Sequence, residues 1–241
     1  MTCMRNTMCV FGGWILLSVW PSMSTAGGSA FELCPSTAVD PGTEKQCHAA
    51  IAEAERAADS ELLAQLLEGL AVMYEGEQRH EEAVVTLRRS IQVAAPDHSY
   101  NARKRLANLL EKSGELEEAR VILESLVSET GSASRGETVR RGHIELQLAD
   151  VYVKLEKPDL AEQYYKRSIL DLDRGPEDDP TYPALVRLIR LYLQQGRNRD
   201  AIEACMEYKK SRGVGSASAT EVCQKLGDRN SFEEGGEVTL K

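Results

Sequence analysis

The stretch LEGLAVMYEGEQRHEEAVVTLRRSI, residues 67–91, places two alanines, Ala71 and Ala83, twelve positions apart. A leucine precedes the first alanine and Tyr74 follows it by three, while Leu87 follows the second by four, so each set shares one face of a helix. The stretch therefore predicts two amphipathic helices whose backbones approach closely at their small residues.

The same offset of twelve residues occurs three more times along the chain. The further pairs are Ala107 with Ala119, Ala149 with Ala161, and Ile189 with Ala201, where isoleucine replaces the small residue. We therefore expect four helix pairs in a row. Two stretches between them, GSASRGE (131–137) and DRGPEDDP (173–180), have the composition of loops.

Turn-forming residues agree with this division. Gly76, Gly114 and Gly196 fall between the two helices of units one, two and four, where a helix C-terminus favours a residue that tolerates positive φ. Unit three has Lys157-Pro158-Asp159 instead, and a proline in the first helical turn lacks only a donor that would be unpaired there.

Four stretches share the pattern. They are 67–91, RLANLLEKSGELEEARVILESL (105–126), LQLADVYVKLEKPDLAEQYYKRSI (146–169) and LVRLIRLYLQQGRNRDAIEACMEY (185–208). They resemble the tetratricopeptide repeat, and the resemblance covers about residues 61–211. Offsets of 36, 42 and 40 residues between units exceed the roughly 34 of the family, and the later units are similar to the repeats of kinesin light chains.

The resemblance implies an all-α fold, a right-handed superhelical α-solenoid of about four helix pairs. The expected repeats over 59–212 are 59–94, 98–130, 137–173 and 180–211. Because an array exposes apolar surface at both ends, we expect capping helices at 43–58 and 213–226. A disordered tail is expected at 227–241, which has no helical stripe.

The first 26 residues are typical of a secretory signal peptide. Arg5 is their only charged side chain, and the uncharged run from Met8 to Trp20 is shorter than the roughly 20 residues that a transmembrane helix needs. Cleavage after Ala26 is expected, or else after Ala30, with 27–42 as a linker. An uncleaved membrane anchor is the alternative. We therefore predict an exported protein of the bacterial periplasm or another secretory space.

Charge and cysteines fit an exported, acidic chain. The formal net charge of −9 disfavours binding to nucleic acid, and no membrane contact is expected of the mature chain. Four of the six cysteines lie beyond the signal peptide, and an even count points to disulfides. We favour Cys34 with Cys47 and Cys205 with Cys223 among the three connectivities, and free buried thiols are the alternative.

No motif predicts catalysis, a metal or a cofactor. The four histidines lack the four-residue spacing that places two ligands on one helix face. Asp171, Asp173 and Gly175 begin a calcium-loop pattern, but Tyr182 stands where the bidentate glutamate is needed. A solvated loop and a non-enzymatic protein are the preferred interpretations, and a hydrolase or metalloenzyme is the least favoured class.

In the family, the first helix of each unit lines the inner surface. The corresponding positions here are Glu68, Val72, Lys104, Asn108, Leu146, Asp150, Val186 and Arg190. Relatives that grip a peptide's terminal carboxylate use lysine, asparagine and arginine in three successive first helices. This chain offers Lys104 and Asn108, then Gln147, then Arg187, while Pro183 removes one cation.

We therefore predict a scaffold or adaptor that binds segments of an unidentified protein or peptide on the concave face of the solenoid, with a monomer as the expected form. Capture of peptide C-termini is the second hypothesis.

Overall fold

A computed structural model describes residues 34, 41–131, 134–172, 182–212 and 223. Its helices are α2 (Pro41–Ala57), α3 (Ser60–Gly76), α4 (His80–Val93), the 3₁₀ turn η1 (Pro96–His98), α5 (Tyr100–Ser113), α6 (Leu116–Glu129), α7 (Arg135–Lys154), α8 (Pro158–Leu172), α9 (Tyr182–Gln194) and α10 (Asn198–Arg212). No strand occurs in these ranges. The predicted signal peptide, most of the linker, the loop at 173–180, the C-terminal cap except Cys223, and the tail lie outside the described residues.

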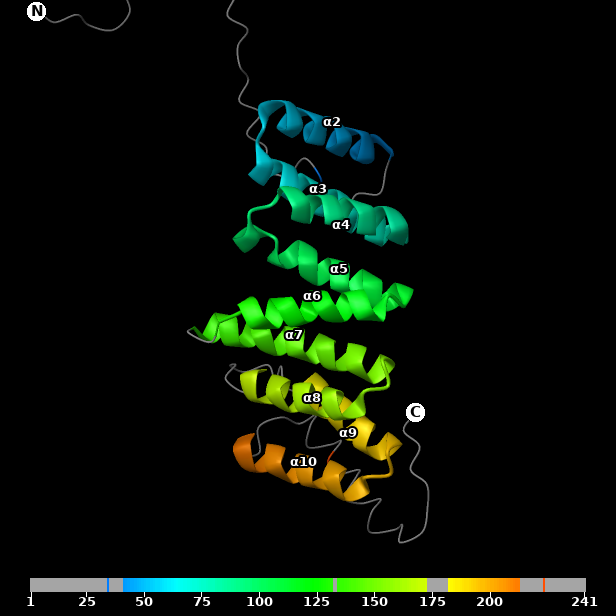
Figure 1. Ribbon diagram of the computed structural model, residues 1–241, viewed down its shortest axis with the longest axis vertical. Helices are drawn as coiled ribbons and strands as arrows, with labels where there is room; N and C mark the ends of the chain where they lie inside the picture. The colour runs from blue at the N-terminus through cyan, green and yellow to red at the C-terminus, as the bar shows by residue number, and fades with distance from the viewer. Residues whose placement is uncertain (1–33, 35–40, 132–133, 173–181, 213–222, 224–241) are drawn as a thin grey trace, which may run out of the picture.

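The helices stack one after another into an α-solenoid, with α2 at one end and α10 at the other (Figure 1). Each helix packs against its sequence neighbours, and α3 with α4, α5 with α6, α7 with α8, and α9 with α10 form the helix pairs. The all-α solenoid expected from the repeated pattern is thus confirmed. The helix α2 covers the outer side of α3.

The small residues that define the repeat lie at the centres of the helix contacts. Seven of these positions are alanines that are completely buried: Ala71, Ala83, Ala107, Ala119, Ala149, Ala161 and Ala201. Ile189, at the eighth equivalent position, is also buried, with 1% of its surface exposed. Close backbone approach at these positions lets the larger leucines and tyrosines interdigitate beside the contact.

Turns within the helix pairs follow one rule. A residue with positive φ stands seven positions after Ala71, Ala107, Ala149 and Ile189; these residues are Gln78, Gly114, Glu156 and Gly196. The expectation for Gly114 and Gly196 is confirmed, with φ of 89° and 71°. The expectation for Gly76 is wrong, because Gly76 is the last residue of α3 and Gln78 adopts the left-handed conformation at φ 61°.

The start of α7 also differs from expectation. The stretch 131–137 was predicted as a loop, but α7 begins at Arg135. The Ser134 side chain accepts a hydrogen bond from the Glu137 backbone, and the Glu137 carboxylate accepts one from the Ser134 backbone. This reciprocal capping box satisfies two donors that a bare helix start would leave unpaired, so the helix begins earlier.

Both ends of the array carry a cysteine pair. Cys34 is bonded to Cys47 of α2, and Cys205 of α10 to Cys223, with Cα–Cα distances of 5.0 and 5.5 Å. These are the pairs that the sequence favoured. Cys34 packs on α3, where its Cβ and carbonyl oxygen would lie 3.0 and 3.1 Å from a Cβ placed at Gly69. Only glycine allows this approach.

Candidate functional site

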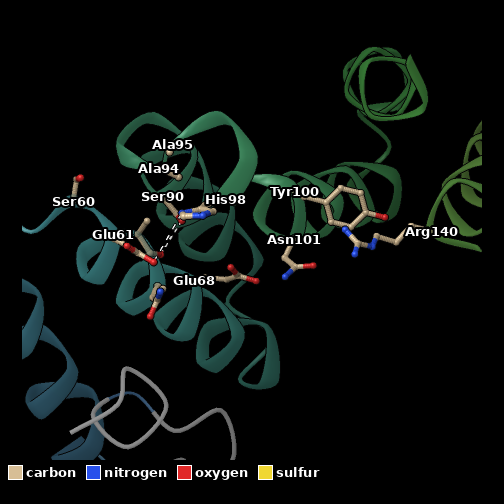
Figure 2. A pocket seen from close by; sticks show the side chains of 12 residues that line it. Ser60, Glu61, Glu68, Ser90, Ala94, Ala95, His98, Tyr100, Asn101 and Arg140 are labelled. Atoms are coloured by element: carbon tan, nitrogen blue, oxygen red, sulfur yellow. Dashed lines mark hydrogen bonds and ion pairs between the residues drawn. The ribbon is translucent and has the colours of Figure 1, made fainter. Parts of the chain in front are cut away.

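Two adjoining hollows lie along α3, α5 and α7. The first, of about 600 Å³, is bounded by the beginning of α3, the end of α4, η1, the beginning of α5, and Arg140 of α7. Figure 2 shows Glu61 and Glu68 on one side of it, Tyr100 and Arg140 on the other, and Asn101 between them. The second, of about 480 Å³, shares Glu68 and Asn101 with the first. We call this continuous surface the α3–α5–α7 face.

Three of the four predicted peptide-binding residues meet in the second hollow. Lys104 and Asn108 of α5 and Gln147 of α7 all line it. Lys104 forms no ion pair with any described carboxylate, and the buried Nε2 of Gln147 has no hydrogen-bond partner among the described residues. A buried donor and a cation of this hollow therefore have no hydrogen-bond or ion-pair partner within the described residues.

Arg187, the fourth predicted residue, is engaged elsewhere. Its guanidinium pairs with Asp150, which also accepts a 2.7 Å hydrogen bond from the Tyr165 hydroxyl. Neither hollow includes Arg187. Burial raises the pKa of Asp150, against the lowering effect of Tyr165 and Arg187, so this carboxylate depends on its two partners.

Acidic side chains share the second hollow with Lys104. The Arg105 guanidinium lies between two carboxylates, with N–O distances of 3.6 Å to Glu68 and 3.6 Å to Glu75. Burial raises the pKa of Glu68 even though Arg105 opposes it. Apart from this ion pair, the buried Oε1 of Glu75 has no hydrogen-bond partner among the described residues. The face thus presents both signs of charge together with polar atoms that make no hydrogen bond within the described residues.

The predicted lining of the inner surface is partly wrong. Leu146 is buried in the core with 9% exposure, because it packs between helices instead of facing solvent. Val72 and Val186 are half-buried, and Arg190 is exposed but lines neither hollow. Sequence reasoning missed Asn101, although it stands seven residues before Asn108 on the same helix face.

No sequence pattern predicted the other residues that line the first hollow. Tyr100 and Arg140 come from different units, and the Arg140 guanidinium lies 5.7 Å from the centre of the Tyr100 ring. His98 comes from the turn between units, where its Nδ1 lies 4.0 Å from Glu61. Only the way the α4–α5 connection folds over α3 brings these residues together.

No group of three or more His, Cys, Asp or Glu side chains among the described residues is placed to hold a metal ion. Asp171, from the calcium-loop pattern, accepts a 2.6 Å hydrogen bond from Arg141. None of the described helices has the length and apolar character needed to cross a membrane.

Comparisons with known proteins agree with the geometry. Residues 146–180 match the profile of the family described as Tetratricopeptide repeat. BtubC (BKLC) from P. vanneervenii is 16% identical, with a TM-score of 0.56 over 82% of this chain and 93% of that one. A putative kinesin light chain from Podosopora anserina is 15% identical, with a TM-score of 0.59 over 80% and 88%.

A third similar structure is pilF of Pseudomonas aeruginosa, 16% identical, with a TM-score of 0.54 over 79% of this chain and 80% of that one. A search of curated proteins finds no match. Over most of its length the chain therefore has the helical-repeat fold of these solenoids, and residues 146–180 match one tetratricopeptide repeat.

Proposed function

We propose that the chain is a non-catalytic scaffold that holds a segment of another protein on its α3–α5–α7 face. The observation that supports this most is the pair of adjoining hollows, in which Gln147, Glu75 and Tyr100 have buried polar atoms without partners among the described residues. Three of the five such atoms in the described chain lie in these hollows, so unused hydrogen-bonding capacity is concentrated where a ligand would bind.

The lining suits an extended peptide main chain. Asn101, Asn108 and Gln147 each carry an amide that can donate and accept at once, which matches the N–H and C=O groups of a peptide. The helices that hold them are fixed by a continuous core, so binding costs little ordering of the receptor. The ordering cost falls on the partner segment.

A second candidate function is capture of a peptide C-terminus. It is favoured by the meeting of Lys104, Asn108 and Gln147 in one hollow, because a lysine ammonium and two amide donors suit a carboxylate. Glu68 and Glu75 line the same hollow and would repel a carboxylate that enters too far. Recognition would then rest on Lys104 without a second cation from Arg187.

We further propose that the chain works in an oxidising, exported compartment of a bacterium, supported by the signal-like residues 1–26 and by the two cysteine pairs. Intact mass and thiol titration of the protein from its host test this. A processed N-terminus near residue 27 without free thiols is expected, and an unprocessed chain with free thiols would contradict it.

Site-specific photo-crosslinking in the host tests the proposed binding face. A crosslinker at Asn108 should trap a defined partner, whereas one at Gln163, which is exposed on α8, should not. Lys104→Ala with Gln147→Ala should abolish the crosslink, and the control Lys112→Ala at the exposed end of α5 should preserve it. Equal trapping at both positions, or none, would refute the proposal.

Synthetic peptides that match the trapped segment separate the two candidate functions. Weaker binding after amidation of the C-terminus supports terminal capture. Equal binding of the free and amidated forms supports a segment bound along its length.

A further inference from the structure

At one end of the first hollow, two carboxylates have too few neighbouring cations to balance their charge. Glu61 and Glu68 both line it and stand seven residues apart on α3, so they project from the same helix face about 10 Å apart. Among the described residues, the only ion-pair partner of Glu61 is the His98 ring, at 4.0 Å. The only described partner of Glu68 is Arg105, which it shares with Glu75. Within the described chain, two carboxylates therefore face one cavity without a cation that either has to itself.

The wall beside these carboxylates is partly apolar, although Ser60, Gln65 and Ser90 also line it. Ala64, Ala94 and Ala95 line the same hollow, and Figure 2 shows Ala94 and Ala95 on the side of Glu61. Alanine methyl groups leave room for a chain of methylenes, and lysine and arginine bury such stems against apolar surface while the charged end stays polar. The shape and the charges favour the same kind of side chain.

The opposite end of the hollow has the reverse charge. Arg140 packs over the Tyr100 ring and forms no ion pair with any described carboxylate. A second cation next to the first would meet this guanidinium. A single basic residue is therefore favoured over a run of basic residues.

We propose that the first hollow is a specificity pocket for one arginine or lysine side chain of the bound segment, with its stem along Ala64, Ala94 and Ala95 and its cation between Glu61 and Glu68. This rests on the proposed function, because it assumes that a partner segment lies on the α3–α5–α7 face. To the proposed function, the pocket adds the chemical nature of one side chain of the partner segment.

Peptide binding followed by NMR tests the pocket directly. The probe is acetyl-Gly-Gly-Arg-Gly-Gly-amide, and the matched neutral peptide carries citrulline in place of arginine. The arginine peptide should bind about tenfold more tightly, as expected for hydrogen bonds between charged groups. It should shift the side-chain signals of His98 and Asn101, which line the hollow.

Variants locate the effect. Glu61→Gln with Glu68→Gln should remove the preference for arginine over citrulline, while Glu53→Gln, an exposed carboxylate on α2, should keep it. Circular dichroism checks that the helices are retained. Equal binding of both peptides to the native chain, or a preference that survives the double substitution, would overturn the inference.

Failure of this proposal can be told from failure of the proposed function. If the arginine preference is absent but Asn108 still crosslinks a partner, only the basic specificity is wrong. If Asn108 traps nothing, the scaffold function itself is wrong.

Discussion

The Tyr192 hydroxyl donates a 2.9 Å hydrogen bond to Glu162 Oε1, across the junction between units three and four. The Arg197 guanidinium also binds Glu162, at 2.6 Å, and lies 4.5 Å from the centre of the Tyr192 ring. Tyr74 makes the equivalent contact with Glu44, and Tyr152 with Glu124. Three junctions are therefore joined by a tyrosine from one unit and a carboxylate from the helix before it.

Removing the hydroxyl should weaken the last junction. Tyr192→Phe is expected to lower the free energy of unfolding by about 1 kcal/mol, because a partly buried hydrogen bond to a charged group is lost. Urea denaturation measures this. The control is Tyr164→Phe, whose hydroxyl makes no hydrogen bond within the described residues and which should change stability little. Equal losses in both variants would contradict the role of the hydroxyl.

Glu162 should also make the chain sensitive to acid. Burial disfavours its charge, but hydrogen bonds from Arg197, Lys166 and Tyr192 outweigh burial and hold its pKa at about 2. A carboxyl with a lowered pKa stabilises the fold above its unfolded pKa, near 4.5, and this contribution is lost as the pH falls from about 4.5 to about 2.

Glu162→Gln should therefore lower stability at pH 7 but flatten its decline below pH 4.5. Denaturant unfolding between pH 7 and pH 2.5 measures the slope. Glu203→Gln, an exposed carboxylate of α10, is the control and should leave the slope unchanged. An unaltered slope in Glu162→Gln would argue against this assignment.

Glu145 should have the opposite pH dependence. Its side chain is completely buried, its Oε1 lies 2.7 Å from the Arg167 guanidinium, and its Oε2 has no partner among the described residues. Burial raises its pKa to about 7, although Arg167 and Arg141 favour the charged form and Asp171 disfavours it. A raised carboxyl pKa stabilises the fold at low pH, and this contribution is lost as the pH rises through about 7.

Glu145→Gln should thus be more stable than the native chain at pH 8.5, by about 2 kcal/mol, and nearly equal to it at pH 5. Thermal unfolding at the two pH values gives the comparison. A variant that is less stable at pH 8.5 would mean that the ion pair with Arg167 outweighs the burial of the charge.

The helix pairs could be predicted from the sequence because close packing requires small residues at fixed offsets, as at Ala71 and Ala83. The residues of the candidate site could be predicted only in part. Lys104 and Asn108 share one helix face, so their common position follows from helical periodicity. The engagement of Arg187 by Asp150 and the approach of Arg140 to Tyr100 depend on how neighbouring units rotate. No local pattern encodes that rotation.

Gly69 should matter through Cys34. Alanine normally stabilises a helix interior by about 1 kcal/mol over glycine, but at Gly69 the added Cβ would lie 3.0 Å from Cys34 Cβ. Gly76→Ala meets nothing within 4 Å and is the matched control. We expect Gly69→Ala to be less stable than Gly76→Ala by about 1 kcal/mol or more in urea denaturation. The gap should shrink in Cys47→Ala, which releases Cys34 from α2 and lets its backbone and Cβ move away, and a gap that persists there would exclude the bonded Cys34 as its cause.

Reduction of the disulfides should loosen the ends of the solenoid first. The pairs close loops with sequence separations of 13 and 18 residues, and each should stabilise the fold by about 3 kcal/mol through the entropy of the unfolded chain. Cys47 lies in α2 and Cys205 in α10, whereas α5 to α8 contain no cysteine. Amide hydrogen exchange should therefore become faster on reduction in α2 and α10 before it does in α6 and α7.

The double variant Cys205→Ala with Cys223→Ala should reproduce the change in α10 alone, because repeat arrays lose structure from the end that is released. Equal thermal stability in oxidised and reduced protein would contradict a stabilising role for either bond.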